Sequence, residues 1–221
     1  MNKKRFVALI SVFFVCVAIV VAANVLKWPG YRHAMVLPVL YLAALTFVVG
    51  KGRGLWLPLG LLFSTAGDLM GSMGLFIPQI GCFALAHVSY IIYFLRRAWL
   101  RPGLLVACVA VLAVAVGLGF VILPHVESVA EKAAVLAYIV VISLMCMSAI
   151  LWRGENKVWY ITAAVLFMFS DTVIALNRFV TPIPYSSVII MTTYYSAQVI
   201  LAGAYLSRFM RDRRFNPAIR A

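Results

Sequence analysis

Two aspartates stand inside long apolar stretches of the sequence. Asp68 lies in the run Ser64–Ser72, and Asp171 lies in the similar run Phe169–Thr172. The chain has only six acidic residues, and the other four fall in polar connections or near the C-terminus. A carboxylate at membrane depth costs about 2.5–3.5 kcal/mol even on the mildest insertion scale. The two aspartates are therefore the first candidates for a functional site.

Paired carboxyl groups in an apolar surrounding are suited to acid–base chemistry. Two like charges repel strongly where the dielectric constant is low, so one carboxyl keeps its proton while the other is ionised. Glycosidases hydrolyse their substrates with such a pair. Paired aspartates also serve as proton relays in carriers, so a hydrolase and a proton-coupled transporter of small molecules or lipids are both consistent with these residues.

The composition is that of a protein that crosses a membrane several times. Of the 221 residues, 65% are hydrophobic and 11% are charged, and the mean hydropathy is +1.05. A soluble core cannot bury so much apolar surface. The net charge of +13 does not indicate a nucleic-acid partner, because the basic residues form short clusters between apolar runs. The four cysteines form no CxxC motif, so neither a disulfide framework nor a zinc site is expected.

Periodic apolar runs predict an all-α fold with one transmembrane domain over residues 1–221. Each run is bounded by glycine, proline or charged residues, and about 20 apolar residues suffice to cross a bilayer, so the chain has room for about eight spans. The predicted helices lie near 6–26, 34–49, 55–72, 78–95, 103–123, 132–152, 158–176 and 185–207, and a basic tail follows at 208–221.

The basic clusters give these helices an orientation. Clusters precede the first helix and follow the second, fourth, sixth and eighth, while the opposite loops hold fewer Lys and Arg residues. By the positive-inside rule both termini are cytoplasmic. The sequence thus predicts an integral multi-pass protein, in the cell (inner) membrane if the source is bacterial.

A matched spacing suggests an internal repeat. Trp56 precedes Asp68 by twelve residues, and Trp159 precedes Asp171 by twelve. Helices three and four would then correspond to helices seven and eight in a parallel 4+4 arrangement. With or without a repeat, both aspartates are expected near the outer ends of their helices and at comparable depth.

Small and polar residues share one face of the third helix. Gly60, Ser64, Gly67, Asp68 and Gly71 follow each other at spacings of three and four. Small residues allow a neighbouring helix to approach closely. Asp68 is therefore expected inside the bundle and not against lipid.

Further polar residues lie one turn apart on the fourth and eighth helices. We predict that six polar side chains face one outward-opening cavity: Asp68, His87, Tyr90, Asp171, Tyr194 and Gln198. Interhelical hydrogen bonding alone would also explain the four uncharged residues. A structural ion pair would explain the aspartates, but neither predicted span supplies a Lys or Arg, and Arg178 is roughly 10 Å from Asp171 along the helix.

Several short motifs carry a resemblance to a known family. They are Gly67–Asp68, Ala86–Tyr90 with Tyr93–Phe94, Ser170–Asp171 with Phe179, and Tyr194–Gln198. In order and spacing, over roughly residues 34–207, this set resembles the lysoplasmalogenase-like membrane family, also called the YhhN family. Each motif alone is short, and the ordered set is the specific signal.

The resemblance implies an eight-helix enzyme that hydrolyses the vinyl-ether bond of lysoplasmalogen to a fatty aldehyde and a glycerophospho head group. The implied partners are a lysophospholipid substrate and membrane lipid, and no cofactor is expected. One position departs from the family pattern, because members tend to carry Lys–Pro on the second helix where this chain has Leu37–Pro38. If that lysine contacts a phosphate, head-group recognition in this chain is altered or lost.

Vinyl-ether hydrolysis begins with protonation of the β-carbon and needs a carboxylic acid, a carboxylate and a positioned water. We predict that Asp68 and Asp171 form the catalytic pair, with either one as the acid, and that His87 positions the water or shares the proton. The expected substrate-binding residues are Tyr90, Tyr194, Gln198 and Ser64. Substrate is expected to arrive laterally from the outer leaflet, since the aspartates lie on that side.

Two alternatives remain open at this stage. Asp68, His87 and Asp171 offer two carboxylates and one imidazole, which a metal ion accepts as ligands. No metal is expected, since only one histidine lies within a predicted span, and chelation would discriminate. A carrier would place its substrate site near the midplane, whereas both aspartates are expected near one surface.

Overall fold

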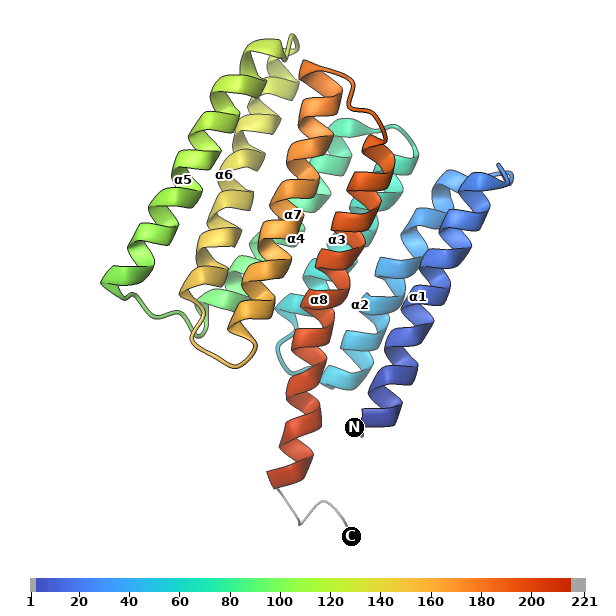
Figure 1. Cartoon of the computed structure of the whole chain (residues 1–221), viewed down its shortest axis with the longest axis vertical. Helices are drawn as coiled ribbons and strands as arrows, with labels where there is room; N and C mark the ends of the chain where they lie inside the picture. The colour runs from blue at the N-terminus through green and yellow to red at the C-terminus, as the bar shows by residue number, and fades with distance from the viewer. Residues whose placement is uncertain (1–2, 216–221) are drawn as a thin grey trace.

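The computed structural model describes residues 3–215, which form a bundle of helices (Figure 1). The eight α-helices are α1 (Lys3–Val25), α2 (Leu37–Gly50), α3 (Trp56–Ser72), α4 (Phe76–Leu95), α5 (Pro102–Ile122), α6 (Val129–Leu151), α7 (Lys157–Ala175) and α8 (Ser186–Phe215). Short 3₁₀ helices at Tyr31–Val36 and Leu123–His125 and a π-helical turn at Leu176–Val180 complete the elements. No β-strand occurs within the described range, so the all-α prediction is confirmed.

The helices have the length and composition of membrane spans. Seven are long and apolar enough to cross a bilayer. The remaining helix, α3, has 17 residues, which correspond to roughly 26 Å at 1.5 Å per residue, close to the ~30 Å of a hydrocarbon core. The protein is therefore an integral multi-pass membrane protein, as predicted.

Figure 1 shows how the helices are arranged. Helix α1 lies at one edge of the bundle and α5 at the other, and α3 and α4 lie behind α7 and α8. Closely packed pairs include α3 with α4, α7 with α8, and α4 with α6. In α5 only Ala115 and Ile122 are buried, because this helix packs mainly against α6.

The beginning of α1 and the end of α8 lie at the same end of the bundle (Figure 1). An even number of spans requires this arrangement. The cytoplasmic location of that end remains a prediction.

Helix α8 continues through Phe215, beyond the predicted end at residue 207. Arg208 anchors the extension by donating a hydrogen bond of 2.7 Å to the hydroxyl of Tyr93. The last part of the predicted tail, residues 216–221, lies outside the described residues.

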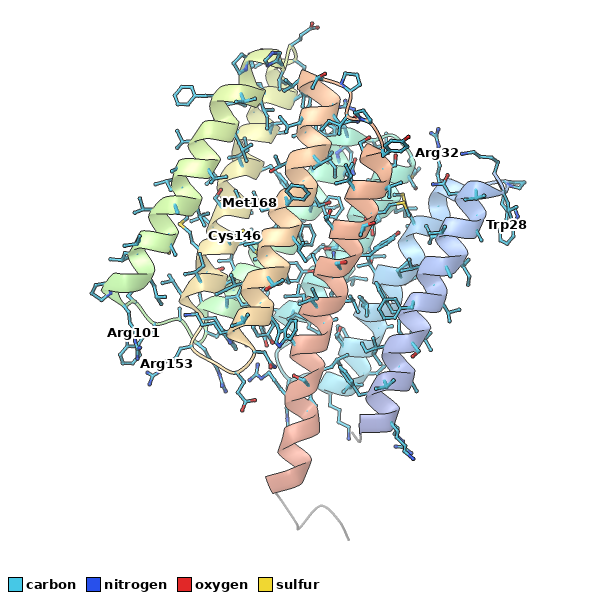
Figure 2. All side chains as sticks on the ribbon, viewed as in Figure 1. Trp28, Arg32, Arg101, Cys146, Arg153 and Met168 are labelled. Carbon is cyan, nitrogen blue, oxygen red and sulfur yellow. The ribbon has the colours of Figure 1, made fainter. Side chains whose placement is uncertain are left out.

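Two loops at this end are joined through their backbones. Trp99 donates its N–H to the Leu151 carbonyl (2.9 Å), and Arg153 donates its N–H to the Arg97 carbonyl (2.7 Å). The Arg153 guanidinium lies 4.1 Å from the centroid of the Trp99 ring; Figure 2 shows Arg153 beside Arg101 at this end. The bridge ties the end of α4 to the end of α6, two helices that both contribute to the site.

Candidate active site

Three glycines of α3 bring α4 close. A Cβ atom added at Gly60 would collide with the Tyr90 ring, one at Gly67 would meet Phe83 at 3.0 Å, and one at Gly71 would overlap the Gln79 amide. The predicted small-residue face of α3 is thus the face that receives the side chains of α4. Asp68 lies on it and is only 5% exposed.

Asp68 forms its hydrogen bond with the last helix. The hydroxyl of Tyr194 in α8 donates to Asp68 Oδ2 at 2.8 Å, and the bond is buried. In the described part of the chain, no Lys or Arg forms an ion pair with Asp68 or Asp171. A buried structural ion pair with a basic residue therefore does not explain either aspartate.

Asp171 belongs to a second polar group built by α4, α6 and α7. Tyr138 donates its hydroxyl proton to Asp171 Oδ2 at 2.5 Å. His87 Nε2 lies 2.9 Å from the Tyr138 hydroxyl oxygen and 3.6 Å from Asp171 Oδ2. Since the one Tyr138 proton goes to Asp171, His87 donates its Nε2 proton to the Tyr138 oxygen. His87 Nδ1 is buried and has no partner among the described protein atoms.

A third group joins the remaining predicted residues. The hydroxyl of Tyr90 lies 3.3 Å from Ser64 Oγ and donates to Gln198 Oε1 at 3.4 Å. All three side chains are fully or almost fully buried. The amide nitrogen Nε2 of Gln198 has no hydrogen-bond partner in the described structure, so this group keeps one unused buried donor.

Aromatic rings lie between the two aspartate groups. Phe167 makes edge contacts with His87 and Tyr194, at centroid distances of 4.7 and 5.3 Å. Phe83 lies 6.3 Å from Phe167 and 5.9 Å from Tyr194. The six predicted residues thus form one buried cluster, in which each aspartate has its own hydrogen-bonding environment.

A mainly apolar cavity borders this cluster between α4, α5, α6 and α7. Its volume is about 60 Å³, and Phe76, Phe83, Tyr138, Ile142, Met168 and Phe179 are among its lining residues. Of the six residues predicted to face one cavity, Asp171 alone lines this one within the described structure. The prediction of a cavity shared by all six is wrong. Close packing of α3, α4 and α8 instead buries the other five behind the aromatic rings.

Comparison with known proteins identifies the family of the chain. A model of the YhhN family matches residues 31–205. The chain belongs to the YhhN family.

Relatives of this chain carry one enzyme name. It is 33% identical to lysoplasmalogenase TMEM86B of Sus scrofa over 86% of this chain and 82% of that protein. It is 30% identical to the lysoplasmalogenase of Mycobacterium bovis over 86% and 74%. With lysoplasmalogenase TMEM86A of Homo sapiens it shares 34% identity over 65% of this chain, and the match spans 62% of that relative. No solved structure matches the chain.

The predicted catalytic residues of this YhhN protein do not form a three-ligand cluster. Among the described residues, no group of three or more His, Cys, Asp or Glu side chains is placed to hold a metal ion. His87 contacts Asp171, whereas Asp68 binds Tyr194. The set Asp68, His87 and Asp171 is therefore divided between two hydrogen-bonded groups.

Sequence reasoning missed Tyr138, which contacts both His87 and Asp171. A signal was present, because Tyr138 is the only aromatic residue in the run 132–151. A hydroxyl in an otherwise apolar span needs a partner in the bundle. Gln79, whose side chain lines the outer part of the cavity, was missed as well.

Proposed function

We propose that this chain is an intramembrane hydrolase that cleaves the vinyl-ether bond of a lysoplasmalogen-type lysophospholipid. The observation that carries the proposal is a single carboxyl group at the wall of a mainly apolar cavity. Asp171 is hydrogen-bonded to Tyr138 and lies near His87, and the cavity beside it is lined mainly by aliphatic and aromatic side chains. The relatives named lysoplasmalogenase support the same activity.

The cavity has the chemistry expected for the alkenyl chain of the substrate. Ile142 and Met168 lie on its inner part, and Phe76 and Phe179 lie on its outer part, near the helix ends. Transfer of an alkenyl chain from water to an apolar environment is favourable by about 0.8 kcal/mol of free energy per CH₂ group. The membrane already supplies part of that gain. The cavity therefore serves mainly to orient the double bond beside Asp171.

In the proposed reaction Asp171 is the acid. Tyr138 donates to Oδ2, so Oδ1 is the atom available to carry the proton. Proton transfer to the β-carbon forms a C–H bond and converts the vinyl ether to an oxocarbenium ion. Water adds to the cationic carbon and gives up a proton to the Asp171 carboxylate, which regenerates the acid. The hemiacetal then breaks its bond to the glycerol oxygen, which takes up a proton, and the products are an aldehyde and the glycerophospho head group.

His87 and Asp68 have separate roles in this proposal. His87 Nε2 lies 2.9 Å from the Tyr138 hydroxyl, so His87 holds the Tyr138–Asp171 pair in place; it does not line the cavity and acts by positioning. Asp68 is the second carboxyl group of the cluster; its Oδ2 accepts a hydrogen bond from Tyr194, and it acts from behind the aromatic rings without lining the cavity. Tyr90, Gln198 and Ser64 support this part of the cluster and do not line the cavity, so they act by positioning.

Aldehyde release from a lysoplasmalogen by the purified protein tests the proposal. Asp171→Asn should lower kcat at least a hundredfold, in line with the loss of a catalytic proton-transfer group, and Asp68→Asn should lower kcat as well. In D₂O the aldehyde should carry one deuterium on the carbon next to the carbonyl, provided the product is trapped at once. The saturated 1-alkyl analogue should release nothing, because it cannot form the oxocarbenium ion by protonation.

The contrary result is equally specific. A wild-type protein that releases no aldehyde, together with aspartate-dependent proton flux in proteoliposomes, would favour a carrier. Retention of near-normal activity by Asp171→Asn would remove Asp171 as the acid. Loss of activity on chelation, restored by added metal, would replace the acid–base scheme with a metal-dependent one.

A further inference from the structure

Arg178 lies at the outer mouth of the Asp171 cavity. Its guanidinium carbon is 4.1 Å from the centroid of the Phe76 ring and 5.3 Å from that of Phe179. Both rings line the cavity. Arg178 also donates a hydrogen bond of 2.9 Å from Nη2 to Glu131 Oε1 in the first turn of α6. One side chain therefore connects the outer ends of α4, α6 and α7.

The backbone that presents Arg178 is irregular. After Ala175, helix α7 passes into a π-helical turn at Leu176–Val180, which contains Arg178 and Phe179. Such turns are rare, and they are often found at functional sites. Asn177 holds the following loop by accepting the N–H of Ile183 at 2.8 Å. The turn directs Arg178 and Phe179 together over the cavity mouth.

The charge of Arg178 is available to a ligand. Its side chain is 44% exposed, compared with 25% for Glu131. A guanidinium has five N–H donors, and the bond to Glu131 uses one nitrogen, so further donors can face an incoming anion. Arg is suited to phosphate because its planar fork matches two phosphate oxygens.

We propose that Arg178 forms a phosphate-binding subsite at the mouth of the Asp171 cavity and recognises the phosphodiester of the lysophospholipid substrate. This inference rests on the proposed function and identifies Arg178 as the side chain that recognises the phosphate of the head group.

The spacing between the two sites suits such a substrate. Arg178 follows Asp171 by seven residues, which is roughly 10 Å along a helix. In a lysoplasmalogen, five single bonds of about 1.5 Å each separate the ether oxygen from the phosphorus atom. The Asp171 and Arg178 side chains can bridge the remaining distance. The ether carbon thus reaches the acid while the phosphate stays at the water-exposed mouth.

Two substrates separate phosphate recognition from catalysis. One is a lysoplasmalogen, and the other is a 1-alkenylglycerol, which has the same vinyl ether but no phosphate. Arg178→Gln should raise KM for the lysoplasmalogen at least tenfold, with kcat within about twofold of wild type, and should leave both constants for the alkenylglycerol unchanged. Equal losses with both substrates would mean that Arg178 only holds the helix ends together, and the proposal would be wrong.

Arg32→Gln is the matched control. Arg32 is an exposed arginine of the 3₁₀ helix Tyr31–Val36 at the same end of the bundle, and Figure 2 shows it beside α1 and α2, away from the α5–α7 side. The Arg32→Gln variant loses the same surface charge as Arg178→Gln, so its KM for the lysoplasmalogen should stay at the wild-type value. A KM rise equal to that of Arg178→Gln would indicate a general surface-charge effect and overturn the subsite. Arg178→Lys, which keeps the charge and should fold if the glutamine variant does not, is expected to show a smaller, phosphate-dependent rise.

Binding of a saturated 1-alkyl lysophospholipid distinguishes failure of this proposal from failure of the hydrolase assignment. This ligand has the phosphate but cannot be cleaved, and its binding to protein in nanodiscs needs no turnover. Weaker binding to Arg178→Gln than to wild type supports the subsite even if no aldehyde is ever released. Equal binding overturns it. Displacement of the lipid by millimolar inorganic phosphate would show a site for free anions and would also contradict a lipid-specific subsite.

Discussion

Asp171, Tyr138 and His87 show how one hydroxyl can organise a buried acid. The Tyr138 proton is committed to Asp171 Oδ2, and its oxygen accepts from His87 Nε2. This leaves the other carboxyl oxygen, Oδ1, for chemistry. At the scale of single residues, the proposed mechanism depends on a tyrosine that never contacts the reacting bond.

Tyr138→Phe tests that positioning role. A hydrogen bond to a charged group contributes about 1.5–3 kcal/mol, which corresponds to a rate factor of roughly 10–150. We expect kcat for aldehyde release to fall by this amount with little change in KM. Tyr93→Phe is the control, since Tyr93 is a buried tyrosine that bonds Tyr160 and Arg208 near the opposite end of the bundle. An unchanged kcat in Tyr138→Phe, or a rise in KM alone, would contradict the positioning role.

Helix α3 determines how closely the polar cluster can assemble. Its glycines have no side chains at the positions where Tyr90, Phe83 and Gln79 of α4 pack against it. In a bilayer, apolar side chains gain little by leaving lipid, so close backbone approach and interhelical hydrogen bonds hold helices together. The face of α3 therefore both packs the bundle and brings Ser64 and Asp68 to their partners.

Gly60→Ala tests the packing of this element. The added methyl group would collide with the Tyr90 ring, which is 1% exposed and has no room to move. Overpacking of this kind costs about 1–3 kcal/mol. We expect a lower Tm in detergent and reduced activity. Gly117→Ala in α5 is the control, because nothing lies within 4 Å of its added Cβ; it should leave Tm unchanged or raise it slightly. Equal Tm values for the two variants would contradict the packing role.

Each aspartate also makes its contact with a helix from the other half of the chain. Asp68 of α3 binds Tyr194 of α8, while Asp171 of α7 lies near His87 of α4. Each aspartate thus contacts the helix that follows the other aspartate along the chain. A parallel 4+4 repeat would give this pattern, and the repeat remains a prediction.

For the whole molecule, the mouth of the Asp171 cavity lies at one end of the bundle. The helix ends that form the cavity mouth, near Phe76, Glu131 and Arg178, are opposite the end where α1 begins and α8 ends. The positive-inside rule predicts that this mouth faces the non-cytoplasmic side. Substrate would then reach Asp171 from the outer leaflet.

Cysteine labelling tests the orientation. In a protein whose native cysteines are replaced, Ser128→Cys lies in the loop before α6 and Arg101→Cys lies before α5 at the opposite end; both positions are exposed. A membrane-impermeant maleimide should label Ser128→Cys in intact cells and Arg101→Cys only after permeabilisation. The reverse pattern would contradict the predicted topology.

The sequence alone was sufficient for the helical membrane class, the approximate position of the eight helices and the family resemblance. Long apolar runs have few alternatives in a bilayer, because every backbone group must find its hydrogen bond within a helix. The same physics identifies Asp68 and Asp171, since a carboxyl in an apolar run is costly wherever the run lies. None of these inferences depends on which helix lies beside which.

Only the tertiary structure decided which partner each aspartate has and which of them the cavity exposes. Tyr138 and Asp171 are 33 residues apart, and Tyr194 and Asp68 are 126 apart. Such contacts depend on the rotation and neighbours of each helix. Small-residue packing and interhelical hydrogen bonds determine the rotation and the neighbours of each helix. In a uniformly apolar span these determinants leave only a weak periodic signal in the sequence. The aromatic rings of Phe83 and Phe167, which read as ordinary apolar residues in the sequence, separate Asp171 at the cavity wall from Asp68 behind it.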